Sequence, residues 1–290
     1  MNGLTALRLA RVSNLPTVWT NAMAGVALAG GAPLSGRTAL AALALSLFYS
    51  GGMFLNDAFD HAIDRRERPQ RPIPSGAVSL EGVFGAGFAM LLAGLALVVW
   101  VAAGFAPPTA WQGPLAGIAL AAAILLYDWN HKGNPLSPVS MALCRALAYL
   151  TAGFAAVTAA GPGVWTVALV GGCHIVGLTY VARQENLTRL ENLWPLALLA
   201  VPLLYGLWLA LGSAVGLALW AGLAACVGLA LRWLRRRGPG DVKSAVVTLI
   251  AAVALLDGIF LAATGWPAAA LVAALAFALT LLLQRYVPGT

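Results

Sequence analysis

The sequence predicts an all-α protein, a bundle of nine to ten membrane-spanning helices that forms one domain over residues 1–290. Hydrophobic residues make up 61% of the chain, charged residues make up 9%, and the mean hydropathy is +0.85. These values exclude a water-soluble domain. Backbone amides in lipid need partners within the same segment, so apolar runs of spanning length form helices, and the abundant Gly and Ala let such helices pack closely.

Ten apolar runs approach the length of about 20 residues that crosses a bilayer. They lie at residues 14–31, 38–59, 79–104, 111–128, 138–160, 162–183, 193–212, 214–234, 244–264 and 266–284. The first run has polar residues and no small-residue cleavage site, so we expect a retained span rather than a removed signal peptide. Those polar residues are Asn14, Thr17, Thr20 and Asn21.

The basic residues between the apolar runs are concentrated in every second connection. If the N-terminus is cytoplasmic, the odd-numbered connections hold only Arg37, whereas the even-numbered ones hold Arg65, Arg66, Arg68, Arg71, Lys132, Arg183, Arg189, Arg232, Arg235, Arg236, Arg237 and Lys243. The positive-inside rule therefore predicts a multi-pass protein whose N-terminus and polar loops face the cytoplasm. The net charge of +7 reflects this orientation, and no nucleic-acid partner is expected. Three cysteines, far apart in apolar runs, indicate neither a disulfide framework nor a zinc site.

An acidic and basic segment lies where the second apolar run meets water. Asn56, Asp60 and Asp64 are four residues apart, so one continuous helix would align them in a stripe with Asp57 on its flank. Such hard oxygen ligands suit Mg²⁺ bridged to a phosphate, and the arginines that follow can grip further phosphate oxygens. The alternative is a solvated helix end, but the acids and bases are segregated rather than mixed, which favours a binding site.

The segment NDAFDHAIDRRERPQRPIPSG, at residues 56–76, closely resembles the first signature of the UbiA superfamily of intramembrane prenyltransferases. Supporting similarity runs from Arg11 through Asn14 and Thr17 to the 127–145 region. The resemblance implies a UbiA prenyltransferase-like helical bundle around a lipid-accessible cavity. It also implies Mg²⁺-dependent transfer of an isoprenyl group from its diphosphate to an aromatic or other small or lipid acceptor. Metal ions and basic residues would promote ionisation of the donor, in a cavity that excludes water.

Residue roles follow from the same resemblance. Asn56, Asp60 and Asp64 match catalytic, metal-binding positions, with Asp57 and Glu185 as further candidate metal ligands. The expected diphosphate-binding residues are Arg68, Arg71, Tyr127, Lys132, Arg145 and Arg183. An arginine two turns into an apolar span is costly and usually faces a polar cavity or an anion, so Arg145 is notable on its own. The alternative for Arg145 is a side chain that snorkels to the interface.

The second acidic motif of the family departs from its pattern here. Several aspartates are expected near the end of the sixth span, but residues 180–186 read YVARQEN, with Glu185 as the single acid. One metal assisted by Arg183 is one possibility, and altered or lost catalysis is another. The second possibility leaves a non-catalytic isoprenyl-diphosphate or lipid carrier as the alternative function. The family's usual nine spans also suggest that one late run is a surface or re-entrant helix.

Other polar and aromatic residues allow more than one role. A membrane phosphotransferase of the CDP-alcohol type would need Gly directly after Asp60, where His61 stands. Asp257, deep in the ninth run, is either a hydrogen-bonded structural acid or a functional one. The aromatic and sulfur side chains before the acidic segment are candidates to line the donor pocket, with core packing as their alternative role. They are Phe48, Tyr49, Met53 and Phe54.

Overall fold

The computed structural model describes residues 2–104, 110–157, 159–183 and 194–287, and within these ranges the chain is helical with no strand. The helices are α1 (Gly3–Leu9), α2 (Leu15–Leu28), α3 (Gly36–Phe59), α4 (His61–Glu67), α5 (Leu80–Ala103), α6 (Gln112–Asn130), α7 (Ser137–Ala156), α8 (Gly163–Arg183), α9 (Ala200–Ala210), α10 (Ala214–Arg236), α11 (Asp241–Ala263) and α12 (Pro267–Leu283). Two 3-10 segments, η1 (Val12–Asn14) and η3 (Trp194–Leu199), precede α2 and α9. The all-α prediction is confirmed.

Each of the ten apolar runs corresponds to a helix, but the helices differ in length. Among the described residues, seven are long and apolar enough to cross a membrane: α3, α5, α6, α7, α8, α10 and α11. The apolar segments Trp194–Ala210 and Pro267–Leu283 are shorter, and α2 has 14 residues. At 1.5 Å per residue α2 extends about 21 Å, less than the roughly 30 Å of a hydrocarbon core. The count of nine to ten full spans therefore exceeds the seven that meet both criteria.

The short helix α2 lies at the centre of the bundle. It packs against α3, α7, α8, α11 and α12, so its polar side chains are inside the protein rather than in lipid. Thr17, Thr20 and Asn21 are each 1% exposed. Glycine permits part of this packing, because a Cβ at Gly25 would lie 2.6 Å from the carbonyl oxygen of Tyr149 on α7. These contacts explain why a polar first run is retained within the fold.

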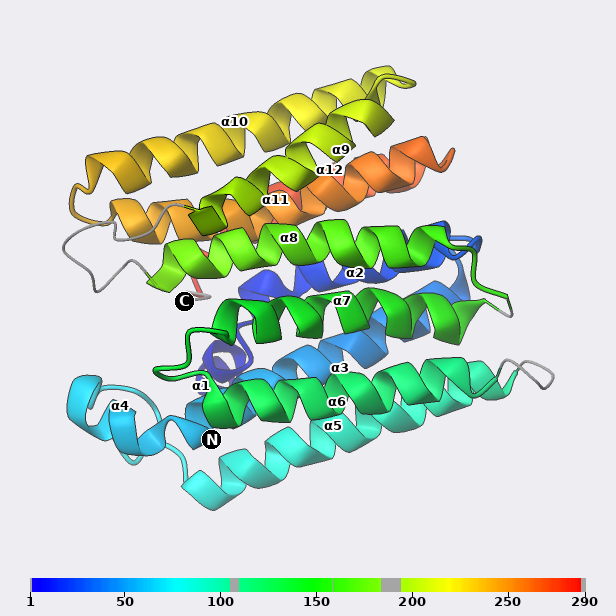
Figure 1. Cartoon of the computed structure of the whole chain (residues 1–290). Helices are drawn as coiled ribbons and strands as arrows, with labels where there is room; N and C mark the ends of the chain where they lie inside the picture. Colours follow the sequence, from blue (N-terminus) through cyan, green and yellow to red (C-terminus); the bar gives the residue numbers. More distant parts are fainter. Residues whose placement is uncertain (1, 105–109, 158, 184–193, 288–290) are drawn as a thin grey trace.

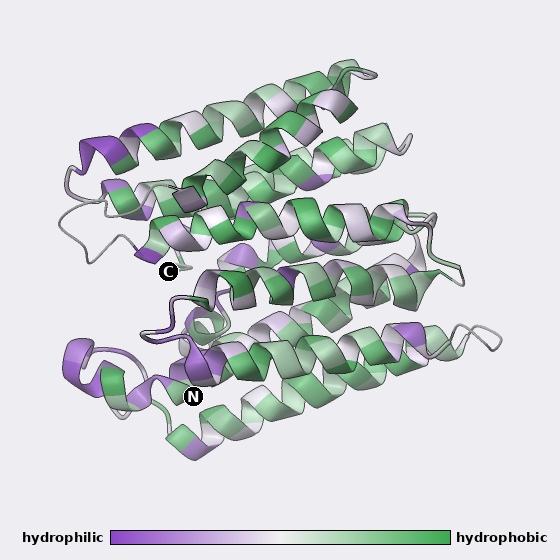
Figure 2. Cartoon of the chain, in the orientation of Figure 1, coloured by the Kyte–Doolittle hydropathy of each residue, from purple (hydrophilic) through white to green (hydrophobic). Residues whose placement is uncertain are grey.

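Polar segments gather at one end of the bundle. Figure 1 shows α1, α4 and the connection between α6 and α7 at this end, which we call the polar end. The hydrophilic colouring of α4 and of the adjoining ends of α6 and α10 in Figure 2 follows the same pattern. Arg37 begins α3 at the opposite end. The predicted separation of polar loops from the remaining connections is therefore visible in the fold.

The predicted single helix through the acidic segment is wrong. The helix α3 ends at Phe59, Asp60 caps it, and α4 begins at His61. The ring nitrogen Nδ1 of His61 lies 2.9 Å from the carbonyl oxygen of Ala58, the acceptor that the N–H of residue 62 would use in an uninterrupted helix. This side-chain bond competes with the helical pattern. Asn56 and Asp64 consequently belong to two different helices.

Candidate active site

A cavity of about 340 Å³ is lined by residues of α2, α3, α6, α7, α8 and α11. Apolar side chains form much of its wall, including Leu45, Phe48, Leu120 and Val253. Polar side chains line one part of it: Arg11, Asn14, Thr17, Asn21, Tyr49, Tyr127, Asp128, Arg145 and Thr179. An apolar chamber with a few convergent polar groups is typical of a small-molecule site.

Arg11 brings a cation to this cavity from the connection between α1 and η1. Its guanidinium Nη2 lies 3.2 Å from Asp57 Oδ1 and 3.4 Å from Asn56 Oδ1. Burial acts to lower the pKa of Arg11, but the interactions with Asp57, Tyr49 and Tyr127 together outweigh burial and raise that pKa above its ordinary value. The backbone here is left-handed, with φ of 45°, a region that costs an L-residue free energy. Because its pKa is raised, Arg11 remains charged beside the acidic segment.

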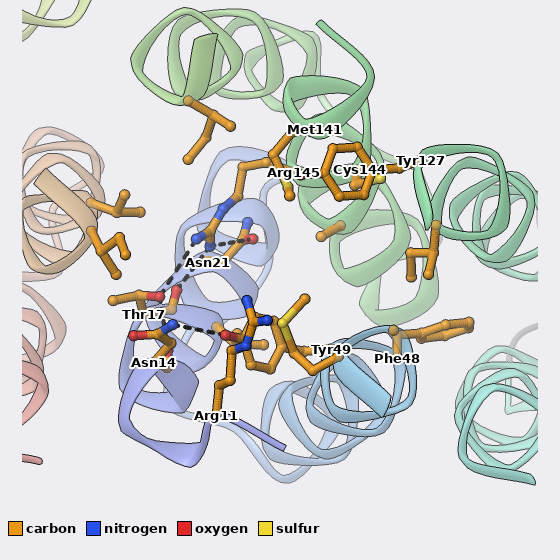
Figure 3. Close-up of a pocket in the computed structure, with 18 of the residues that line it drawn as sticks. Arg11, Asn14, Thr17, Asn21, Phe48, Tyr49, Tyr127, Met141, Cys144 and Arg145 are labelled. Carbon is orange, nitrogen blue, oxygen red and sulfur yellow. Dashed lines mark hydrogen bonds between the residues drawn. The ribbon is translucent and has the colours of Figure 1, made fainter. Parts of the chain in front are cut away.

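Arg145 reaches the same cavity from α7. Its Nη1 donates to the Thr17 carbonyl oxygen at 3.2 Å and to Asn21 Oδ1 at 3.0 Å. Figure 3 shows Arg11 and Arg145 directed toward one space from different elements, with dashed bonds from Arg145 to α2. Because the guanidinium bonds inside the cavity, the snorkelling alternative for Arg145 does not describe its position. An arginine facing a polar cavity is the arrangement expected where an anion binds.

A second set of bonds links the cavity wall to the last helix. Asn14 Nδ2 donates to the Tyr49 hydroxyl at 2.8 Å, and Gln284 Nε2 donates to Asn14 Oδ1 at 2.6 Å. The Asn14–Tyr49 bond is drawn in Figure 3. Gln284 follows α12 directly. A residue near the end of the chain thus helps to hold two residues that line the cavity.

The predicted acidic ligands are buried at the polar end of α3, but each carboxylate has basic partners. Asp57 pairs with Arg11 and Arg71, both at 3.2 Å, and Asp64 pairs with Arg71 at 2.7 Å. Asp60 Oδ2 lies 3.2 Å from Lys132 Nζ and 3.5 Å from a ring nitrogen of His131. These ion pairs compensate the charge of each carboxylate, with partners that range from the nearby Arg71 to Lys132 after α6.

The electrostatics of Asp60 follow from these partners. Burial acts to raise the pKa of Asp60, whereas the hydrogen bond and charge of His131, together with Lys132, lower it below its ordinary value. Asp60 is therefore an anion at neutral pH. Asn56 extends the set, since its Nδ2 donates to Asp128 Oδ1 at 3.1 Å, and Asp128 itself lines the cavity. The acidic segment and the cavity are thus adjoining parts of one polar region.

The donor chemistry of this region suits a magnesium ion, because carboxylate and amide oxygens are the ligands that Mg²⁺ prefers. The arrangement fits less closely: no group of three or more His, Cys, Asp or Glu side chains is placed to hold a metal within the described ranges. Metal binding by Asn56, Asp57, Asp60 and Asp64 would require carboxylates to exchange a basic partner for the ion. Glu185 lies outside the described residues.

The predicted diphosphate-binding residues lie in different parts of the structure. Tyr127 and Arg145 line the cavity, and the Tyr127 ring stacks on His131 with centroids 4.8 Å apart. Lys132 and Arg71 contact the acidic segment instead. Arg183 Nη1 donates to the carbonyl oxygens of residues 134 and 135, at 3.1 and 3.2 Å. Arg183 therefore holds the connection between α6 and α7, and it does not line the cavity.

Arg68 and one of the predicted pocket residues lie away from the cavity. Arg68 caps α4 and takes part in none of the ion pairs found among the described residues. Phe48, Tyr49 and Met53 line the cavity, as expected for donor-pocket residues. Phe54 does not, because it packs in a separate hydrophobic cluster with Leu9, Ala58 and Val83.

Arg11, Asn14, Thr17 and Asn21 were missing from the predicted site. A signal existed, because these polar residues recur every three or four positions through the start of the first apolar run. That spacing places them on one helix face. What the sequence could not show is that this helix lies at the centre of the bundle, where it packs against α3, α7 and α11.

The sequence model described as "UbiA prenyltransferase family" matches residues 18–246. Curated relatives carry the name digeranylgeranylglyceryl phosphate synthase. The protein from Methanopyrus kandleri is 31% identical over 214 residues, which are 72% of this chain and 72% of that protein. The one from Sulfolobus acidocaldarius is 28% identical over 51% of this chain and 52% of its own length. The one from Methanoregula boonei is 36% identical over 44% and 42%.

A solved structure shares the fold. It has a TM-score of 0.63 and 19% sequence identity, and the match covers 90% of this chain and 97% of that chain. Its description reads "Structural and mechanistic insights into the biosynthesis of Digeranylgeranylglyceryl phosphate synthase in membranes". At this identity the likeness concerns the fold alone. The multi-pass membrane architecture predicted from hydropathy agrees with it.

Proposed function

The chain belongs to the UbiA prenyltransferase family, and from this premise we propose that it transfers an isoprenyl group from an isoprenyl diphosphate to a lipid acceptor in a Mg²⁺-dependent reaction. The observation that carries the proposal is the cavity itself, in which two arginines from different elements face a largely apolar chamber. The arginines suit the diphosphate, and the apolar wall suits the isoprenyl chain. Few other ligands combine these two chemistries.

Arg11 and Arg145 are the proposed diphosphate ligands inside the cavity. Each presents several N–H donors in a planar fork that matches phosphate oxygens. Tyr127, which lines the same cavity, adds a hydroxyl donor. Arg68 is the proposed arginine at the polar end, since Arg71 already pairs with Asp57 and Asp64. Lys132 and Arg183 are proposed to contribute through the electrostatic field of the polar end.

Asn56, Asp57, Asp60 and Asp64 are the proposed metal-holding residues, with Glu185 as a further candidate. Their oxygens fit a hard divalent cation, and they adjoin the cavity through the Asn56–Asp128 and Asp57–Arg11 contacts. When bound, Mg²⁺ supplies positive charge that makes diphosphate a better leaving group. Lys132 and Arg71, which pair with these carboxylates, would each have to give up a carboxylate oxygen to the ion.

The reaction breaks the bond between the donor's C1 and a diphosphate oxygen, and the electron pair leaves with diphosphate. Arg11 and Arg145 stabilise the charge that develops on that oxygen. The aromatic faces of Phe48 and Tyr49, in the cavity wall, favour the allylic cation. The acceptor's oxygen lone pair then forms the new bond to C1, and the hydroxyl proton passes to the released diphosphate. The apolar wall keeps water from capturing the cation.

The acceptor is proposed to be a lipid alcohol rather than an aromatic compound. The relatives are named for a glyceryl phosphate that bears two geranylgeranyl groups, which supports a prenylated glyceryl phosphate as the acceptor class. The polar end, with N-terminus and loops, is proposed to face the cytoplasm, because basic residues gather there and only Arg37 marks the other side. A phosphorylated acceptor would then approach from the cytoplasmic leaflet.

Diphosphate release tests this proposal against the alternative of a non-catalytic carrier. Purified protein in lipid, supplied with geranylgeranyl diphosphate and geranylgeranylglyceryl phosphate, should release diphosphate and form an ether product only when Mg²⁺ is present. A matched reaction with an aromatic acceptor pool should release far less. Tight donor binding with no product from any acceptor would favour the carrier and refute the transferase proposal.

A further inference from the structure

Asp257 lies fully buried in α11 and is bound from two other helices. It is 0% exposed. Thr20 on α2 donates to Asp257 Oδ2 at 2.6 Å, and Tyr149 on α7 donates to Asp257 Oδ1 at 2.6 Å. Both carboxylate oxygens thus have hydroxyl donors, which offsets the cost of burying this group in a membrane protein. We call Asp257, Thr20 and Tyr149 the carboxylate clasp.

The same two helices hold Arg145. Tyr149 follows Arg145 by four residues on α7, so the two side chains share one helix face. On α2, Thr17 and Asn21 bind Arg145 and flank Thr20 on the same face. The clasp and Arg145 therefore lie next to each other along the interface between α2 and α7. A change in the register of either helix would move both.

The packing around Tyr149 leaves little freedom for such movement. Its side chain is 0% exposed. A Cβ at Gly171 on α8 would lie 2.6 Å from its ring, and a Cβ at Gly25 on α2 would lie 2.6 Å from its carbonyl oxygen. Tyr149 is thus held by α2, α8 and α11 at once. Its hydroxyl bond to Asp257 fixes the ring against the last of these.

Arg145 has no carboxylate within ion-pair distance in the part of the chain that the structure describes, since it takes part in none of the six ion pairs found there. Its guanidinium is held by neutral oxygens alone. Such a cation is available for an anionic ligand, but its aim depends on the backbone and amide oxygens of α2. Asp257 is the carboxylate that ties α2 to α7.

We propose that Asp257, through its bonds to Thr20 and Tyr149, is a positioning residue that aims Arg145 at the diphosphate of the donor. The inference rests on the proposed function of Arg145 and adds to it a role for α11. Asp257 does not line the cavity, so it acts through the two helices that it joins. Its loss should weaken diphosphate binding without removing any group that touches the ligand.

A double-mutant cycle separates positioning from general stability. The probe is inorganic diphosphate, whose affinity for the full-length protein in detergent micelles is measured by calorimetry. Asp257→Asn keeps the shape of the side chain but leaves one hydroxyl without an acceptor, and Arg145→Ala removes the cation. We expect each single variant to bind diphosphate at least about threefold more weakly. The double variant should be no weaker than Arg145→Ala alone, because coupled residues do not contribute independently.

Two further variants protect the test against misfolding. Thr20→Val removes one donor of the clasp with little change of volume, and should reproduce part of the Asp257→Asn loss. Asp241→Asn is the matched control, because Asp241 is a buried carboxylate on the same helix that pairs with Arg236 instead. It should lower the melting temperature and leave diphosphate affinity unchanged.

Two results would overturn the inference. Strictly additive losses in the double variant would show that Asp257 affects diphosphate binding independently of Arg145. Unchanged affinity in both Asp257→Asn and Thr20→Val would show that the clasp stabilises the fold alone. Unchanged affinity in Arg145→Ala would instead remove the proposed role of Arg145 and, with it, the group that Asp257 is said to position. The two failures are therefore distinguishable.

Discussion

Replacing Arg11 separates its proposed role in binding from its cost to the backbone. Its backbone is left-handed, with φ of 45°, where a side chain with a Cβ costs about 1–2 kcal/mol and glycine costs much less. Arg11→Ala and Arg11→Gly both remove the cation, but only the glycine relieves this strain. Allowing for the greater freedom of glycine in the unfolded chain, we expect Arg11→Gly to be more stable than Arg11→Ala by about 1 kcal/mol.

Loss of the Arg11–Asp57 ion pair should have only a small effect on stability. Arg11 and Arg71 both lie 3.2 Å from Asp57 Oδ1, so Asp57 keeps one partner in either variant. The unfolding free energy lost with the Arg11–Asp57 pair should therefore be about 1 kcal/mol. This is well below the roughly 3–5 kcal/mol cost of a buried charge left unpaired. A charge-assisted hydrogen bond to diphosphate is worth about 1.5–3 kcal/mol, so donor affinity should fall about 10- to 150-fold in both variants.

Two assays measure the stability difference and the loss of donor affinity. Unfolding in detergent measures the stability difference between Arg11→Ala and Arg11→Gly. Calorimetric titration with a non-hydrolysable thio analogue of geranylgeranyl diphosphate measures donor affinity. Equal stability of the two variants would refute the strain at this position. Wild-type affinity in both would refute Arg11 as a diphosphate ligand.

Two other substitutions test the packing of the site. Arg71→Ala leaves Asp64, which is 2% exposed, without its arginine, and should lower the unfolding free energy by about 3 kcal/mol; the exposed Arg66→Ala should change it little. Gly25→Ala places a Cβ 2.6 Å from the α7 backbone and should cost about 1–3 kcal/mol. Gly85→Ala on α5, where a Cβ would meet nothing within 4 Å, is its matched control. Thermal unfolding in one detergent measures all four.

Each of these substitutions has a contradicting result. Equal melting temperatures for Arg71→Ala and Arg66→Ala would mean that the carboxylates of the acidic segment do not depend on Arg71. A Gly25 variant as stable as the Gly85 variant would mean that α2 and α7 tolerate a wider separation. Either result would weaken the description of a site held by close helix packing.

Much of the fold could be predicted because hydropathy and charge act locally along the chain. The ten apolar runs correspond to ten helices, and the acidic segment lies beside the connection after α6, as Lys132 and Asp60 show by their contact. The sequence predicts Tyr127 and Arg145 as diphosphate-binding residues, and both line the cavity. A basic side chain inside an apolar run is a strong local signal, since lipid makes it costly.

The rest depended on contacts between distant residues. Thr20 and Asp257 are separated by 237 positions, and Asn14 and Gln284 by 270, so no local pattern could pair them. The end of α3 at Phe59 is accompanied by a bond from the His61 side chain to a backbone carbonyl, which periodicity does not reveal. The last third of the chain also contributes to the site, because α11 supplies Val246, Ile250 and Val253 to the cavity wall.

The most direct test of the proposed transferase is Mg²⁺-dependent diphosphate release from geranylgeranyl diphosphate by the wild-type protein and by Asp60→Asn, in lipid with the glyceryl phosphate acceptor. We predict release and ether formation in the wild type, loss of both on chelation of Mg²⁺, and loss of both in Asp60→Asn with the helical fold retained. Full turnover by Asp60→Asn, or turnover that persists without divalent metal, would contradict the proposed roles of Asp60 and of the metal.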